Sequence, residues 1–253
     1  MTPFEQVAVL LAGLGAGILT STVGIASLLS FPVLVAVGLP PVVANVSNTL
    51  GMTPGALSGS WGYRSELREY LRATAVVLAT CAVGSVVGAV LLLALPATVF
   101  ESVVPWLILG TCLLVGVQPR LSARLRARRG REAEERLHVS PVTAGFAIVT
   151  GAYGGYFGAG SGVMMLAVLG IGTDLPFRAA NALKTLAVLA ANLVASVVFV
   201  VAADIDWRAV VLLASGSVVG GYVGARIGRR LPAALLRAGI VLAGLVGALL
   251  LWR

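Results

Sequence analysis

The chain consists mainly of long apolar runs separated by short stretches rich in glycine, proline or charged residues. Several runs are long enough to cross a bilayer, because about 20 apolar residues in an α-helix span roughly 30 Å of hydrocarbon. The pattern predicts an all-α polytopic membrane protein with about eight to ten hydrophobic segments. The longer runs cover residues 4–22, 42–61, 73–95, 98–117, 139–157, 176–201, 208–227 and 232–252.

Two further apolar pieces, residues 25–37 and 163–171, are shorter and end at Gly38 and Gly172. A helix of about 13 residues covers only about 20 Å, which is less than the hydrocarbon thickness. Each piece is therefore expected either to be the short arm of a re-entrant hairpin or to complete a pair of spans. Both arrangements return the chain to the side it came from, and the sequence does not choose between them.

The second half of the chain repeats the order of motifs in the first half. Matching positions lie within a few residues of a constant offset of about 134, which is difficult to obtain by accident. We therefore predict two membrane repeats, residues 1–117 and 139–253, joined by a linker at 118–138. The matched pairs are Gly24 and Gly158, Ser27 and Ser161, Gly38 and Gly172, and Pro96 and Pro232.

Arginine is concentrated in three connections, residues 64–72, 118–138 and 226–230. Because Lys and Arg favour cytoplasmic loops, these connections are expected in the cytoplasm, with Asp204, Asp206 and both termini outside. Each half then crosses the membrane an odd net number of times, so the two repeats have inverted topology. Inverted repeats with broken or re-entrant helices are typical of secondary transporters.

The composition supports a membrane location, since 58% of the 253 residues are hydrophobic and only 11% are charged. The net charge of +8 lies in loops beside the spans, so we expect a multi-pass cell-membrane protein that contacts lipid and no nucleic acid. A homo-oligomer is possible. Cys81 and Cys112 both fall in apolar runs and lack metal-ligand spacing, so no metal or other cofactor is expected.

The strongest candidate for a binding site surrounds Lys184, the only lysine of the chain. A charge deep in a membrane span costs several kcal/mol unless it is solvated or paired, so it marks a functional site. On a helix, Asn181, Thr185 and Asn192 project from nearly the same face as Lys184. The alternatives are that these polar residues only hold helices together, and that Lys184 reaches the membrane surface.

A matching polar face occurs in the first half, where Asn45, Asn48 and Thr49 align with Asn181, Lys184 and Thr185. Two such faces in two hydrophobic halves predict one substrate site shared between the repeats.

A dense glycine run at residues 158–162 follows the first apolar run of the second half. Glycines this dense break a helix, and unwound backbone at membrane depth requires cover from protein or a water-filled cavity. The run has no dinucleotide-binding spacing. It is either a structural kink or a break whose amides face an anion, and its candidate site residues are Gly158, Gly160, Ser161 and Gly162.

These motifs resemble those of the TauE/SafE family of sulfite exporters and related permeases. The resemblance covers both halves: a glycine-containing break, a short apolar piece ending in glycine and a polar helix. It also includes Asp206-Trp207 ahead of a Gly-Ser-x-x-Gly motif. The first half departs from the usual consecutive glycines at Ala26 and Ser27. The resemblance implies a multi-pass permease for sulfur oxyanions or organosulfonates, often working as an exporter.

The candidate residues offer hydrogen-bond donors and one positive charge, a combination that suits a small oxyanion. A cation would require carboxylates, and Glu5 and Glu101 lie near the ends of segments. The single His138 gives no pair of nucleophile and base, so we expect no enzyme. We expect a permease that exports sulfite or an organosulfonate. A passive anion channel and a non-transporting membrane scaffold are the alternatives.

Overall fold

The computed structural model describes residues 1–128 and 138–227. Within these ranges the chain forms ten α-helices and no β-strand, which confirms the all-helical prediction. The expected last span, 232–252, lies outside the described residues. The helices are α1 (Pro3–Thr22), α2 (Ser27–Ala36), α3 (Pro41–Gly62), α4 (Arg64–Glu69), α5 (Leu71–Ala94), α6 (Ala97–Arg128), α7 (Pro141–Tyr156), α8 (Ser161–Gly172), α9 (Phe177–Ala202) and α10 (Trp207–Ile227).

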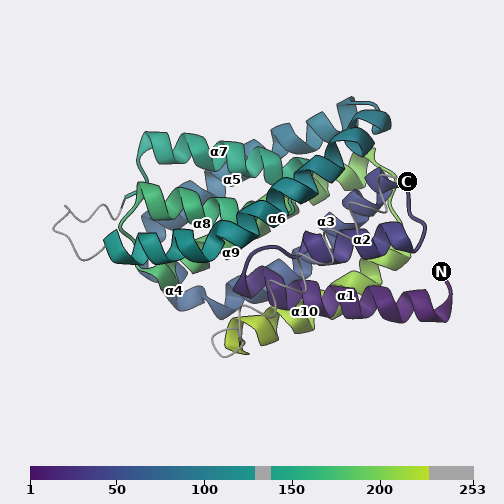
Figure 1. Ribbon diagram of the computed structural model, residues 1–253, viewed down its shortest axis with the longest axis horizontal. Coiled ribbons are helices and arrows are strands. Elements are labelled where there is room, and N and C mark those ends of the chain that lie inside the picture. The colour runs from purple at the N-terminus through teal and green to yellow at the C-terminus, as the bar shows by residue number, and fades with distance from the viewer. Residues whose placement is uncertain (129–137, 228–253) are drawn as a thin grey trace.

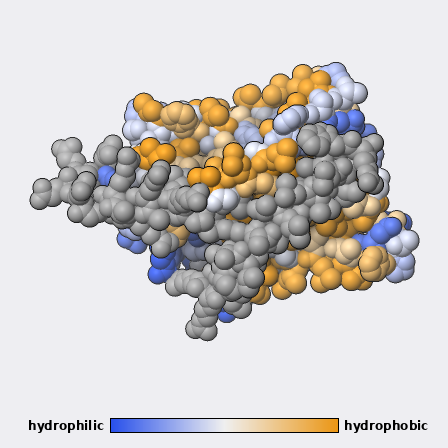
Figure 2. Space-filling model, in the orientation of Figure 1, coloured by the Kyte–Doolittle hydropathy of each residue, from blue (hydrophilic) through white to orange (hydrophobic). Residues whose placement is uncertain are grey.

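Five helices are long and apolar enough to cross a membrane: α1, α5, the Ala97–Leu114 part of α6, α9 and α10. Large apolar side chains such as Leu113, Val149 and Val201 are exposed on the outside of the molecule. On the part of the face in Figure 2 that is not grey, apolar residues predominate, and hydrophilic residues lie mainly towards the two ends. An apolar outer surface of this extent fits a lipid environment, so the protein is a polytopic membrane protein.

The two short apolar pieces are the second arms of hairpins. Helix α2 turns back towards the end of the molecule where α1 begins (Figure 1). Likewise, Gly172 at the end of α8 packs against Thr143 near the start of α7. With 10 and 12 residues, α2 and α8 are about 15–18 Å long, roughly half the hydrocarbon thickness. These lengths favour the short arm of a re-entrant hairpin over a second full span.

Helices of the two halves pack against each other in equivalent pairs. Helix α1 lies along α10, and α7, which corresponds to α1 in the predicted repeat, lies along α5. Both contacts are glycine-lined: a Cβ at Gly216 or Gly220 would collide with the backbone of α1, and one at Gly84 or Gly88 with that of α7. These glycines allow close helix packing. The inverted orientation of the halves remains a prediction.

Arginine-bearing segments gather at one end of the molecule, where α4 and the last turns of α6 and α10 lie (Figure 1). The N-terminus and the connection between α9 and α10 lie at the other end, where the Asp206 N–H donates a hydrogen bond to Ser47 near the start of α3. That the α4 end faces the cytoplasm remains a prediction from the arginines. Helix α6 continues to Arg128, so no helix ends at the predicted repeat boundary at residue 117.

Candidate functional site

The tips of the two hairpins meet inside the protein. Gly24 in the first tip touches Gly162 at the start of α8, and a Cβ on Gly162 would lie 2.9 Å from the Gly24 Cα. Neighbouring tip residues Ile25 and Ala159 are completely buried. Protein therefore covers both helix breaks, as unwound backbone at membrane depth requires.

Both first helices end in the same way. The N–H groups of Val23 and Gly24 both donate to the Leu19 carbonyl, and those of Phe157 and Gly158 both donate to the Tyr153 carbonyl. Gly24, at φ 85°, and Gly158, at φ 78°, have the left-handed conformation that only glycine adopts without strain. The predicted helix breaks are therefore present in both halves, at matching positions.

Lys184 lies beside this meeting point and is fully buried, with 0% of its surface exposed. Its Nζ donates a hydrogen bond to the Thr22 carbonyl oxygen at 3.3 Å, and its Cδ lies next to Gly24. The structure gives it no acidic partner among residues 1–128 and 138–227. Lys184 does not reach the membrane surface, so the snorkelling alternative is wrong for this structure.

Asn181, one turn before Lys184, is tied to the end of α1. Its Nδ2 donates to the Tyr63 hydroxyl at 3.0 Å, and that hydroxyl donates to the Ser21 carbonyl at 3.2 Å. The matching residue Asn45 donates through Nδ2 to the Tyr156 carbonyl at the end of α7, at 2.9 Å. In each half, the asparagine thus holds the first helix of the other half.

Asn48, the counterpart of Lys184, is bound to the first hairpin. Its Nδ2 donates to the Ser27 hydroxyl at 3.1 Å, and its Oδ1 accepts a hydrogen bond from the Ser30 hydroxyl. Gly24, which touches Lys184, lies only three positions before Ser27, which binds Asn48. The first hairpin tip therefore contacts both residues, although no direct hydrogen bond joins them among those the structure describes.

The remaining residues of the two polar faces have local partners or lie farther away. The hydroxyls of Thr49 and Thr185 donate to carbonyls of their own helices, those of Asn45 and Asn181. Asn192 is half-buried and lies about 12 Å beyond Lys184 along α9. In this conformation the two threonines offer no free donor to a ligand.

The second tip is held by α6 and α7. The Ala159 carbonyl accepts hydrogen bonds from the hydroxyls of Thr111 and Tyr153, at 3.0 and 2.6 Å. Gly160, also at φ 78°, packs against Thr111 where a Cβ would not fit. These contacts fix the backbone from which α8 begins.

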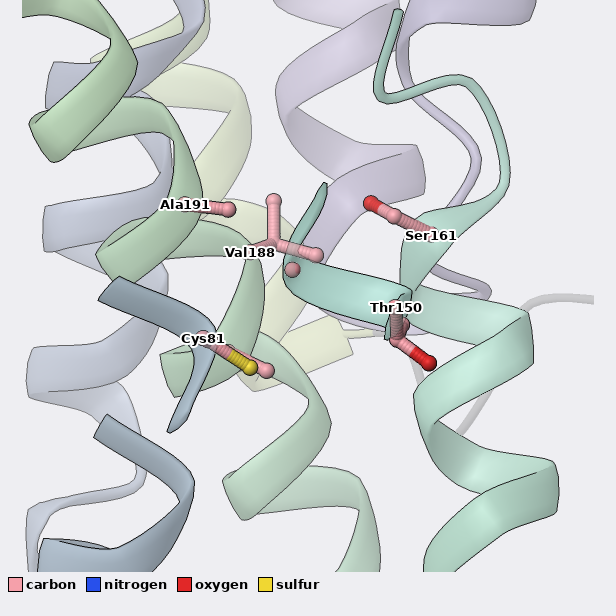
Figure 3. Close-up of a pocket in the computed structure, with 7 residues that line it drawn as sticks. Cys81, Thr150, Ser161, Val188 and Ala191 are labelled. Atoms are coloured by element: carbon pink, nitrogen blue, oxygen red, sulfur yellow. The ribbon is translucent and has the colours of Figure 1, made fainter. Parts of the chain in front are cut away.

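A small cavity lies next to this tip, and Ser161 projects towards its α9 wall (Figure 3). The space between atoms here amounts to about 160 Å³, but it is nowhere wide enough for a water molecule. The conformation is therefore closed here. Its lining consists of Cys81, Thr150, Gly151, Ser161, Ala187, Val188 and Ala191.

An ion pair that the sequence did not reveal links α4 to the start of α9. The Glu66 carboxylate pairs with the Arg178 guanidinium and also accepts a 2.6 Å hydrogen bond from the Ser65 hydroxyl. Burial raises the pKa of the Glu66 carboxyl, but the Ser65 hydrogen bond and the charge of Arg178 together bring that pKa below its usual value. Glu66 is therefore a carboxylate at neutral pH.

These partners were missed because each joins distant parts of the chain. Tyr63 and Asn181 lie in different halves, as do Glu66 and Arg178. The feature of the sequence that could have indicated these partners is that Tyr63 and Glu66 belong to the charged connection after a polar helix. The acceptor of Lys184 is a main-chain carbonyl at the end of α1, and no residue type in the sequence indicates such an acceptor.

An apolar helical fold in which two buried hairpin tips meet beside a buried lysine is typical of membrane transporters. The chain belongs to the sulfite exporter TauE/SafE family, whose sequence pattern matches residues 9–251. It is 30% identical to a probable membrane transporter protein of Haemophilus influenzae, over 91% of this chain and 88% of that protein. It is 29% identical to the probable membrane transporter protein YfcA of Escherichia coli, over 85% and 76%. No solved structure matches the chain.

Proposed function

We propose that this transporter exports a small sulfur-containing anion, sulfite or an organosulfonate, through a site where the hairpin tips meet. Lys184 supplies the positive charge, and Asn48 and Asn181 supply neutral donors. Ser161 and the amides of the second tip complete the site when the tips separate. The family description, which names sulfite export, supports the choice of substrate class.

The observation that carries the proposal is the buried amino group of Lys184, which has a single hydrogen-bond acceptor among the described residues. An ammonium group has three donors, yet the structure gives this one a single carbonyl acceptor and, within its described ranges, no carboxylate. A buried cation in this state is costly, and a bound anion would provide both the missing charge and the missing acceptors. A site that lacks only an anion favours anion transport.

The closed tips fit a carrier cycle. Gly24 and Gly162 are in backbone contact, and the neighbouring cavity has no room for water. Substrate therefore reaches Lys184 only when the tips move. An inside-negative membrane potential favours anion export by about 2.3 kcal/mol per charge per 100 mV, so export requires no buried chain of proton-carrying residues.

Efflux from loaded proteoliposomes tests the proposal. Liposomes with wild-type protein and protein-free liposomes are loaded with radiolabelled sulfite, thiosulfate, sulfate, sulfoacetate or taurine, and a potential is imposed. We expect faster efflux of at least one sulfite-like or sulfonate anion in the presence of the protein. Equal rates for the whole panel would remove the sulfur-anion assignment.

A further inference from the structure

We propose that Glu66 is an internal substitute for the substrate, which occupies Arg178 until a transported anion displaces it. Arg178 is then the first anion-binding residue on the route from the α4 end of the molecule to Lys184. This inference rests on the proposed function, because the displacing ligand is the anion that Lys184 later binds.

The ion pair joins a buried carboxylate to an accessible cation. The Glu66 side chain is only 8% exposed, whereas the Arg178 side chain is 60% exposed at the start of α9. A guanidinium has five donors and pairs with two-oxygen anions in a planar fork, and sulfonate and sulfite oxygens accept in the same way as a carboxylate. An arriving anion can therefore contact the exposed part of Arg178 before the carboxylate has left.

Arg178 begins a row of polar residues that leads to the candidate site. Arg178, Asn181 and Lys184 follow at intervals of three residues along α9, so neighbours in the row are about one turn apart and the whole row rises about 9 Å. One short segment of the chain covers the first two residues of the row: Glu66 pairs with Arg178, and Tyr63 binds Asn181. Tyr63 and α4 thus close the row towards the end where the arginines gather.

The arrangement links arrival of the anion to opening. Glu66 lies in α4, and Tyr63 is the residue immediately before that helix. When an anion replaces Glu66 on Arg178, α4 loses its ion pair with α9, and the adjoining Tyr63–Asn181 contact is no longer supported. The anion is then about 9 Å along the helix from Lys184.

Opposite shifts in transport affinity test the inference. Inside-out membrane vesicles expose the expected cytoplasmic face, and KM is measured there for the anion that wild type transports. Glu66→Gln removes the competing charge and should lower KM about two- to fivefold, which is the effect expected from a partly exposed ion pair. Arg178→Gln removes the binding group and should raise KM by a similar factor. Glu69→Gln and Arg68→Gln change the same charges at exposed positions of α4 and should leave KM unchanged.

A purely structural ion pair gives a different result. Loss of either partner would then lower the thermal midpoint and shift KM in the same direction, or not at all, and that outcome would overturn the inference. If Arg178→Gln fails to fold, Arg178→Lys keeps the charge without the fork and should give a smaller rise in KM.

A binding measurement separates failure of the inference from failure of the proposed function. Thermal midpoints are recorded with sodium methanesulfonate and with sodium chloride at equal ionic strength. Glu66→Gln should gain a larger methanesulfonate-specific shift than wild type, and the gain should vanish in Glu66→Gln/Arg178→Gln. This result without transport of any tested anion would reject the proposed function and retain the anion site. Absence of the gain rejects the site even if wild type transports.

Discussion

At the scale of single residues, the two halves use equivalent positions for different chemistry. Lys184 and Asn48 align in the predicted repeat, yet one is a buried amino group with a carbonyl acceptor and the other is an amide held by two serines. A site between them has one charged side and one neutral side. An anion is therefore expected to depend strongly on Lys184 and more weakly on Asn48.

Asn48→Ala should reduce affinity for the transported anion about three- to tenfold, less than the loss of Lys184, because a neutral hydrogen bond contributes about 0.5–1.5 kcal/mol. Asn181→Ala should give a loss of similar size. Titration of substrate-induced thermal stabilisation measures both. Ser196→Ala is the matched control. It removes a polar contact with Thr53 that joins α9 to α3, the helices that carry Asn181 and Asn48, at a place away from the tips. An effect of Ser196→Ala as large as that of Asn48→Ala would contradict a local role for Asn48.

At the scale of elements, the proposed transport depends on the contact between the hairpin tips. Gly162 is not in the left-handed region, so alanine fits its own backbone conformation. The new Cβ would, however, lie 2.9 Å from both the Cα and the carbonyl oxygen of Gly24. The first backbone must then move by a few tenths of an ångström.

Gly162→Ala should therefore keep the fold but change the efflux rate at least severalfold, because closure of the tips is disturbed. Gly24→Ala should also lower the thermal midpoint, because its left-handed conformation costs a non-glycine residue about 1–2 kcal/mol. Proteoliposome efflux and thermal unfolding measure the two effects. Gly145→Ala, with open space at the new Cβ, is the control. Wild-type efflux from Gly162→Ala would show that the tips do not take part in transport.

The sequence predicted elements better than their contacts. A dense glycine run located the break at Gly158, and its match to Gly24 located the break in the first half, because left-handed backbone strongly prefers glycine. The length of residues 25–37 suited both a hairpin arm and part of a pair of spans, so the return of α2 required the structure. Contacts such as Gly24 with Gly162 join residues in different halves of the chain, and a single sequence taken alone carries no signal for such pairs.

Helix ends were also harder to predict than helix positions. The apolar run of α6 stops near residue 117, whereas the helix continues to Arg128. Hydrophobicity reports the part of a helix in lipid, while backbone hydrogen bonding continues through arginine and alanine, which are good helix formers. At the candidate site, Lys184 was found from its charge alone, but its acceptor is a main-chain group that has no side-chain signature.

At the scale of the whole molecule, the gathering of arginines at the α4 end predicts the orientation in the membrane. In a variant with alanine at Cys81 and Cys112, Asp204→Cys should react with an impermeant maleimide in intact cells, and Arg68→Cys should react only after the membrane is opened. Both positions are exposed in the structure, so accessibility does not bias the comparison. The reverse labelling pattern would place α4 outside and contradict the proposed direction of substrate access.

The central claim is that Lys184 binds the transported anion, and Lys184→Met tests it most directly because methionine keeps an unbranched chain of similar size and removes the charge. Thermal midpoints of wild type and variant are compared over a concentration series of the transported anion. We predict a folded variant whose anion-induced shift requires about ten- to hundredfold more anion, since a charged hydrogen bond contributes about 1.5–3 kcal/mol. Lys184→Arg should restore binding only in part, because a planar guanidinium does not match a compact ammonium. Equal shifts of wild type and Lys184→Met at equal anion concentrations would contradict the account.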